Sequence, residues 1–199
     1  MHFKHANKTP QVHDSAYVAA TATLCGNVVV GAHASILFGA VIVAEGAQVV
    51  IEEHCVIMEN AVVRGTQHHP VHIGRNSLVG PHAHLSGCVL EDRVFIATGA
   101  TILNGARVGT GAEVRINGVV HINTVLAAHD IVPIGWVAVG NPAAILPPEE
   151  HQRIWDIQKT LNFPEVVFGV DRTAAEPLME QITRRYAAAL ATHKDDDML

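Results

Sequence analysis

Large aliphatic residues return at almost every sixth position between about residues 18 and 125, and a small or slender residue follows most of them four positions later. A period this short, with no helical segment in any unit, is typical of a chain that winds into coils stacked on copies of themselves. The large positions are Val18, Leu24, Val30, Ile36, Ile42, Ile51, Ile57, Val63, Ile73, Val79, Leu85, Leu90, Ile96, Ile102, Val108, Val114 and Val120. The pattern predicts an all-β solenoid of about six triangular coils, with both kinds of position pointing inward.

The six-residue count breaks at three points. Three extra residues lie between Ile42 and Ile51, and four lie between Val63 and Ile73. One residue is missing between Leu85 and Leu90. We expect the two insertions to form loops extruded from corners, where solenoids place specific chemistry. Counting coils onward makes Val63 and Leu85 stacked neighbours. Arg64 and Ser86 should therefore project side by side on the outer surface.

The repeat ends near residue 146, and the remainder of the chain has helical character. Glu149 and Glu150 favour a helix start after two prolines, and apolar residues then share one face at Ile154, Ile157 and Leu161. A looser stretch separates this helix from a second one over about residues 176–193, whose apolar positions are Leu178, Ile182, Tyr186 and Leu190. We predict a β-helix domain over residues 1–146 and a helical extension over residues 147–199. The extension should pack back along one side of the prism and end in a disordered acidic tail.

Composition and charge narrow the function classes. The chain is 49% hydrophobic and 16% charged, as suits a continuous core. No apolar run reaches the roughly 18 residues of a membrane span, and the N-terminus lacks an apolar signal core, so we expect a cytoplasmic protein with no membrane partner. The net charge of −6 and the absence of a basic stripe argue against nucleic acid. Cys25, Cys55 and Cys88 are too widely spaced for a metal motif and are expected to be free thiols.

The six-residue repeat, the closing Gly-Asn-Pro-Ala turn and the C-terminal helix together resemble the γ-class carbonic anhydrase-like proteins. The resemblance covers about residues 12–161. It implies a parallel β-helix that is left-handed. The handedness comes from the resemblance, since the six-residue period alone does not determine it. It also implies a homotrimer whose active sites lie between adjacent prisms, each with a metal ion held by three histidines.

The family's metal positions are filled differently in this chain. The first histidine falls on Arg64, at the end of Val-Ile-Met-Glu-Asn-Ala-Val-Val-Arg, and the other two fall on Pro81 and Ser86. The family's catalytic Gln becomes Met58, and its Arg-Gly-Asp becomes Val-Ala-Glu ending at Glu45. Arginine and proline side chains cannot ligate a metal, and serine does so poorly. The standard zinc site is therefore not expected, nor is carbon dioxide hydration by that site.

Histidines gather around the same region. Five of the fourteen lie within seventeen residues, at His68, His69, His72, His82 and His84. Imidazole is a common metal ligand and a common general base. One interpretation is a displaced site for zinc or another divalent metal, with His68, His82 and His84 as ligands. The alternatives are a metal-free pocket with a histidine base, or polar turn residues without a chemical role.

Arg64 is the strongest candidate for substrate binding, because a guanidinium on a rigid strand suits bidentate capture of a carboxylate or phosphate. Its plain alternative is a surface ion pair with Glu45 or Glu59. The candidate catalytic residues are Arg64, Glu45, His69 and Ser86. The candidate substrate-binding residues are Arg64, Met58, Arg115 and Asn117.

Three functions remain open. The first is a γ-carbonic anhydrase-like enzyme with a remodelled site between subunits, acting on a small anionic substrate by hydrolase or lyase/hydratase chemistry. The second is a hexapeptide acyltransferase that uses His68 or His69 as general base. The third is a catalytically inactive structural trimer. A homotrimer is expected in each case, because apolar residues face outward at Leu37, Val43, Met58, Val62 and Leu103.

Overall fold

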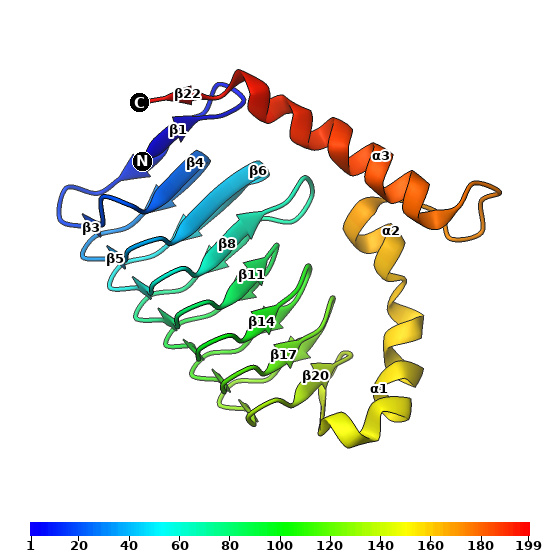
Figure 1. Cartoon of the computed structure of the whole chain (residues 1–199). Coiled ribbons are helices and arrows are strands. Elements are labelled where there is room, and N and C mark those ends of the chain that lie inside the picture. Colours follow the sequence, from blue (N-terminus) through cyan, green and yellow to red (C-terminus); the bar gives the residue numbers. More distant parts are fainter.

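A computed structural model describes all 199 residues. Short parallel strands wind into a left-handed β-helix of about eight turns, followed by C-terminal helices (Figure 1). The predicted fold class is confirmed. The structure has more turns than the six expected, because the winding also includes the N-terminal residues and residues 126–139, where Leu126 and Val132 continue the six-residue spacing.

The prism has three faces, named here first, second and third. The first face is formed by β1 (His2–Lys4), β4 (Thr23–Val30), β6 (Val41–Ile51), β8 (Val62–Gly65), β11 (His84–Ser86), β14 (Thr101–Ile102), β17 (Val119–Val120) and β20 (Val137–Val139). The second face contains β2 (Gln11–Val12), the later parts of β4 and β6, β9 (Val71–Ile73), β12 (Val89–Leu90), β15 (Arg107–Val108) and β18 (Val125–Leu126). A separate sheet makes the third face from β3 (Tyr17–Val18), β5 (Ser35–Ile36), β7 (Val56–Ile57), β10 (Leu78–Val79), β13 (Phe95–Ile96), β16 (Glu113–Val114) and β19 (Ile131–Val132).

The repeated aliphatic positions form the core, as the pattern predicted. Leu24, Ile42 and Leu85 are each 0% exposed, and so are most of the other large repeat positions. Burial of one such side chain contributes about 1.5–3 kcal/mol, so the column of stacked aliphatics is the main source of stability. The three cysteines are free and buried, which confirms that they are not joined in disulfides.

The first interruption of the repeat is not the extruded loop that was expected. Residues 41–51 form the continuous strand β6, which crosses a corner and pairs with β4 on one side and with β8 and β9 on the other. Both flanking coils supply hydrogen-bond partners across the corner, so the extra residues remain in the ladder. The second interruption is a corner loop at residues 66–70, between β8 and β9. The missing residue corresponds to a tight turn at Gly87, whose φ is +50°.

The C-terminal extension runs back along the prism from its last coil to its first (Figure 1). Its elements are β21 (Ala144–Leu146), η1 (Pro148–Glu150), α1 (His151–Gln158), η2 (Lys159–Leu161), α2 (Phe163–Phe168), α3 (Leu178–Leu190), η3 (Ala191–Asp195) and β22 (Asp197–Met198). The stretch expected to be loose contains α2. The tail expected to be disordered ends in β22, which pairs antiparallel with β1 and satisfies that strand's outer edge. The domain boundary at residue 146 stays a prediction. No helix is both long and apolar enough to cross a membrane.

His82 is a turn residue at the corner between the third and first faces. Its φ is +57°, and the equivalent corners of other coils place Asn60 at +58°, Gly99 at +69° and Asn117 at +54°. Asparagine and glycine tolerate this left-handed conformation, whereas β-branched residues do not. His82 and Asn117 therefore have a backbone role in these turns. From the sequence, they were candidates for metal binding and substrate binding, respectively.

We expect His82→Asn to leave the free energy of unfolding within about 0.5 kcal/mol of the parent value, because asparagine already fills this corner elsewhere. His82→Val should lower it by about 1–2 kcal/mol, since a β-branched residue is strained in this conformation. Urea unfolding measures both values. Equal stability of the two variants would contradict the backbone role.

Candidate functional site

A cavity of about 800 Å³ lies between the first face and the helices that cover it. We call the covering segment, formed by α2, α3 and η3, the roof. From the solenoid the cavity is lined by His5, Glu45, Arg64, Thr66, His68, His84, Ser86, Leu103 and Asn104, among others. From the roof it is lined by Phe163, Val167, Phe168, Gly169, Arg185, Tyr186, Ala189 and Thr192. Polar groups from the solenoid thus face a largely apolar cover, an arrangement typical of small-molecule sites.

The strand register places the central polar residues side by side. β8 and β11 pair so that Ser86 is directly opposite Arg64, and β6 pairs with β8 so that Val43 is opposite Arg64. The predicted adjacency of Arg64 and Ser86 on the outer surface is confirmed. Because alternate residues of a strand point to the same side, His84 projects outward together with Ser86.

Arg64 is held by Glu45 and Tyr186. Its Nε donates to Glu45 Oε1 at 2.6 Å, and its Nη2 donates to the same oxygen. The Arg64 side chain is 31% exposed and that of Glu45 is 12% exposed. The Arg64 Cζ atom lies 5.5 Å from the centroid of the Tyr186 ring, within cation–π range. One edge of the guanidinium is therefore fixed by the protein, and its other N–H groups remain for a ligand.

Burial sets the protonation of the groups near Arg64. It lowers the pKa of His84, and the positive charge of Arg64 lowers that pKa further. Burial and the neighbouring His68 likewise lower the pKa of His69. Burial raises the pKa of Tyr186, with Glu45 adding to the effect and Arg64 opposing it. At neutral pH the cavity thus holds a neutral imidazole, able to accept a proton, and a neutral phenol, able to donate one.

The other predicted site residues are dispersed. His69 does not line the cavity, and His68, His82 and His84 do not converge within the chain, because His82 belongs to the opposite corner. Met58, Arg115 and Asn117 follow strands of the third face and are not among the lining residues either. Arg115 Nη2 forms an ion pair with Glu113 Oε2 at 2.5 Å. A shared groove for these residues and Arg64 is not present within one chain.

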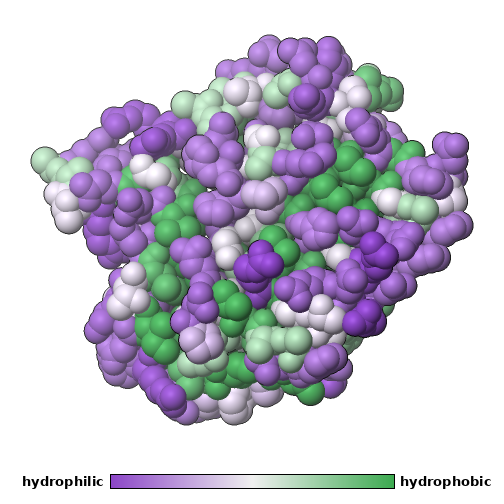
Figure 2. Space-filling view, turned by 180° about the vertical axis from the view of Figure 1, so that it is seen from behind, coloured by the Kyte–Doolittle hydropathy of each residue, from purple (hydrophilic) through white to green (hydrophobic).

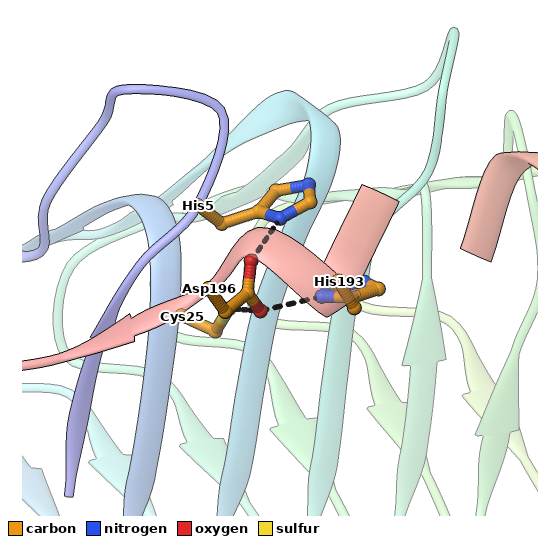
Figure 3. A group of neighbouring side chains, drawn as sticks. All are labelled: His5, Cys25, His193 and Asp196. Atoms are coloured by element: carbon orange, nitrogen blue, oxygen red, sulfur yellow. Dashed lines mark hydrogen bonds and ion pairs between the residues drawn. The ribbon is translucent and has the colours of Figure 1, made fainter. Parts of the chain in front are cut away.

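A second cluster, which sequence reasoning missed, joins the two ends of the chain (Figure 3). His5 follows β1 and Cys25 lies in β4, whereas His193 lies in η3 of the roof and Asp196 directly follows η3. Asp196 Oδ1 is 2.6 Å from His5 Nδ1, and Asp196 Oδ2 is 2.7 Å from His193 Nδ1. The Cys25 thiol donates to Asp196 Oδ2 at 3.5 Å. The two imidazole rings are stacked with centroids 4.2 Å apart.

Electrostatics in this cluster favour a protonated thiol and an ionised carboxyl group. Burial, together with the neighbouring Asp196, raises the pKa of the Cys25 thiol to about 12. Burial alone would raise the pKa of Asp196, but hydrogen bonds from His193, His5 and Cys25 hold it below its usual value. No local sequence motif marks the cluster, because its members meet through the pairing of β1 with both β4 and β22.

Comparison with known proteins identifies the family. No family model matches the chain. The sequence is 31% identical over 204 residues to γ-carbonic anhydrase 1 of Arabidopsis thaliana mitochondria, an alignment that spans 97% of this chain and 72% of that protein. The chain belongs to the γ-carbonic anhydrase family. A carbonic anhydrase of Geobacillus kaustophilus is 31% identical over 104 residues, which are 52% of this chain and 57% of that protein.

Solved structures support the fold alone. A UDP-N-acetylglucosamine acyltransferase of Bacteroides fragilis superimposes with a TM-score of 0.57 at 15% identity, covering 90% of this chain and 89% of that one. A hexapeptide transferase family protein of Anaplasma phagocytophilum gives 0.50 at 22% identity, covering 92% and 94%. The fold is thus shared with these proteins, and a shared fold does not assign an activity.

The residues at the metal positions of the γ-carbonic anhydrase family do not fit a metal ion here. Arg64 is cationic and already bound to Glu45, Ser86 offers one neutral hydroxyl, and Pro81 has no side-chain donor. A cation placed beside the Arg64 guanidinium would be repelled. This family member therefore lacks the chemistry that a metal ion would supply at that point.

The roof also changes the expected subunit contact. Val43 and Val62, which were expected to be covered by a neighbouring chain, instead line a small cavity of about 280 Å³ closed by Leu190 and His193 of the roof. Leu103 lines the main cavity. The apolar positions of the first face are thus covered from within the γ-carbonic anhydrase-family chain itself.

We expect Arg64 and Glu45 to be strongly coupled. Arg64→Ala should lower the free energy of unfolding by about 1–3 kcal/mol, because it leaves a largely buried carboxylate without its donors. The double variant Arg64→Ala with Glu45→Ala should recover part of that loss, giving a coupling energy of about 0.5–3 kcal/mol in a double-mutant cycle. Additive losses in denaturant unfolding would show that the pair does not contribute as a unit.

Proposed function

We propose that this member of the γ-carbonic anhydrase family is an enzyme with a remodelled site, which acts on a small anionic substrate by hydrolase or lyase/hydratase chemistry. The observation that carries the proposal is the arrangement inside the roofed cavity. An oriented guanidinium, a neutral imidazole and a hydroxyl group from Arg64, His84 and Ser86 face a common space closed by the helices.

The charge of the cavity favours an anion. Arg64 and Arg185 line it together with a single carboxylate, that of Glu45. Glu45 occupies one edge of the Arg64 guanidinium and fixes its plane, while Arg185 Nη1 donates to the Gly169 carbonyl oxygen at 2.5 Å. Guanidinium groups with fixed planes suit bidentate binding of a carboxylate. We assign Arg64 to substrate binding and Glu45 to its orientation.

His84 is the general base in this proposal. Its imidazole is neutral near pH 7 because burial and Arg64 lower its pKa. It accepts one proton from a water molecule, whose oxygen then attacks an electrophilic carbon of the substrate held at Arg64. The protonated imidazole can return the proton to the group that leaves, which completes a hydrolysis. His84 replaces His69 in this role, because His84 lines the cavity and His69 does not.

We also propose a homotrimer assembled through the corner between the third and first faces. Phe38, Ile116 and Ile134 are 53%, 46% and 65% exposed there, and the half-buried Leu37 and Met58 are at the same corner. Figure 2 shows hydrophobic residues open to solvent in several areas of the molecule seen from behind. Apolar residues that repeat along one edge of a prism suit contact with a second prism.

The function is tested by screening small carboxylates that carry an ester, amide, thioester or conjugated double bond, with product formation followed by NMR. His84→Gln should reduce kcat on the substrate found by about 10²–10⁴-fold. Arg64→Gln should raise KM as well, because the substrate loses its anchor. Arg107→Gln is the matched control, since Arg107 is an exposed arginine on β15 of the second face. Transfer of an acetyl group from acetyl-CoA, without hydrolysis of any carboxylate in the panel, would instead support an acyltransferase.

The pH profile provides a further check of the base. A lowered pKa for His84 means that the rate should rise with pH, with a midpoint below about pH 6.5, the pKa of a free imidazole. The same shift makes the unfolded chain bind the proton more tightly than the folded one, so stability should fall as the pH drops below 6.5. In His84→Gln this part of the pH dependence of stability should disappear.

For the assembly, light scattering should give three times the chain mass of 21.3 kDa. The double variant Ile116→Glu with Ile134→Glu should shift the mass toward that of one chain, because two charges would be buried at each contact. Val43→Glu is the comparison, since its site is under the roof and should affect folding rather than assembly. A parent protein with the mass of a single chain would refute the trimer.

A further inference from the structure

The cluster of His5, Cys25, His193 and Asp196 has the composition and placement of a metal site. Two of its residues, His5 and Cys25, come from the start of the solenoid, and His193 and Asp196 come from the C-terminal end of the extension. The proposed reaction does not use this cluster. The cluster is also separate from Arg64, Pro81 and Ser86, which stand at the metal positions of the γ-carbonic anhydrase family. Figure 3 shows the four side chains turned toward a common point around the Asp196 carboxylate.

We propose that His5, Cys25, His193 and Asp196 bind a divalent transition metal ion of the zinc class, which fastens the roof to the N-terminal end of the solenoid. The site would be tetrahedral, with two imidazole nitrogens, one sulfur and one carboxylate oxygen.

The geometry is close to that of such a site. The four candidate ligand atoms all lie within 4.8 Å of one another. Zinc bonds of about 2.0–2.3 Å place neighbouring ligand atoms of a tetrahedron about 3.3–3.8 Å apart. The present hydrogen-bond distances of 2.6 and 2.7 Å from Asp196 to the two histidines are shorter than that, and the thiol at 3.5 Å lies within the range. Side-chain adjustments of about an ångström would accommodate the ion.

The donor set also selects the kind of ion. A thiolate and two imidazoles favour zinc, cobalt and similar ions over magnesium or calcium, which prefer oxygen ligands. The charges balance, because a thiolate and a carboxylate together offset a divalent cation. Side-chain exposure is 2% for His5 and 14% for Asp196, so an ion there would be shielded from water. Binding releases the thiol proton that Cys25 now donates to Asp196.

Such an ion would act on the roof. Its ligands lie at residues 5 and 25 on one side and at residues 193 and 196 on the other, so it closes a loop that contains α2 and α3. His5 lines the main cavity and His193 lines the small one. The ion would therefore hold the cover over both cavities in place and raise the stability of the end of α3.

The test is a titration of the full-length protein, treated with a chelator and then given cobalt(II). The parent should bind one equivalent per chain and show the absorption of a cobalt–thiolate bond in the near ultraviolet. Cys25→Ser should lose that absorption, and His193→Gln should bind at least about tenfold more weakly. His54→Asn is the matched control, because His33 and His54 form a similar stacked pair, with centroids 4.9 Å apart, that has no cysteine or aspartate. It should bind like the parent.

Hydrogen exchange supplies the second readout and does not depend on enzymatic activity. Zinc should slow amide exchange in residues 178–190 of the parent at least about tenfold, and should leave the exchange rate of Cys25→Ser unchanged. Cobalt binding without thiolate absorption, or with equal affinity in Cys25→Ser, would place the ion at exposed histidines and overturn the proposal. Absence of binding would also overturn the proposal, and the cluster would then join the two ends of the chain by hydrogen bonds alone.

Discussion

The hydrogen bonds between successive coils are the constraint on which the rest of the structure depends. Each coil satisfies its backbone groups only with the coils above and below, so a solenoid has two open ends. β21 turns back on β20 and closes the last coil, and β22 pairs with β1 at the first coil. Because one extension pairs with the first face at both ends, it must travel the length of the prism. That path puts α2 and α3 over the first face.

The cavity is a consequence of this path. Helices that lie along a pleated, three-sided prism leave space between themselves and its surface. The solenoid residues that face this space are the outward-pointing, alternate residues of β6, β8 and β11. Glu45, Arg64, His84 and Ser86 are such residues. They become partly buried because the roof shields them, and this burial gives His84 and Tyr186 their shifted pKa values. The chemistry of the site thus depends on an element that closes the ends of the sheet.

The sequence predicts well what repeats and poorly what depends on the roof. The inward positions and the pairing of Arg64 with Ser86 follow from counting coils, because each coil contributes three large inward positions even where a corner is longer or shorter. The continuity of β6 does not, since an insertion can remain in the ladder when both neighbouring coils pair with it. The turn positions of His82 and Asn117 do not follow from residue type, because a left-handed turn and a ligand site favour similar residues. The meeting of His5 with Asp196 requires two strands from opposite ends of the chain to pair, and no local pattern records that.

The presence of Arg64, at the position where the resemblance implies a metal-binding histidine, is consistent with the presence of the roof. The resemblance implies a metal ion held by three histidines between adjacent prisms, and Pro81 stands at one of the three ligand positions. A proline supplies none, so the Arg64 side of the site must be completed from its own chain. The roof does this with the Tyr186 ring, which packs against the guanidinium, while Glu45 balances its charge. A fixed cation paired within one subunit remains formed whether or not chains associate. Assembly through the corner at Ile116 and Ile134 would then contribute stability without completing the cavity.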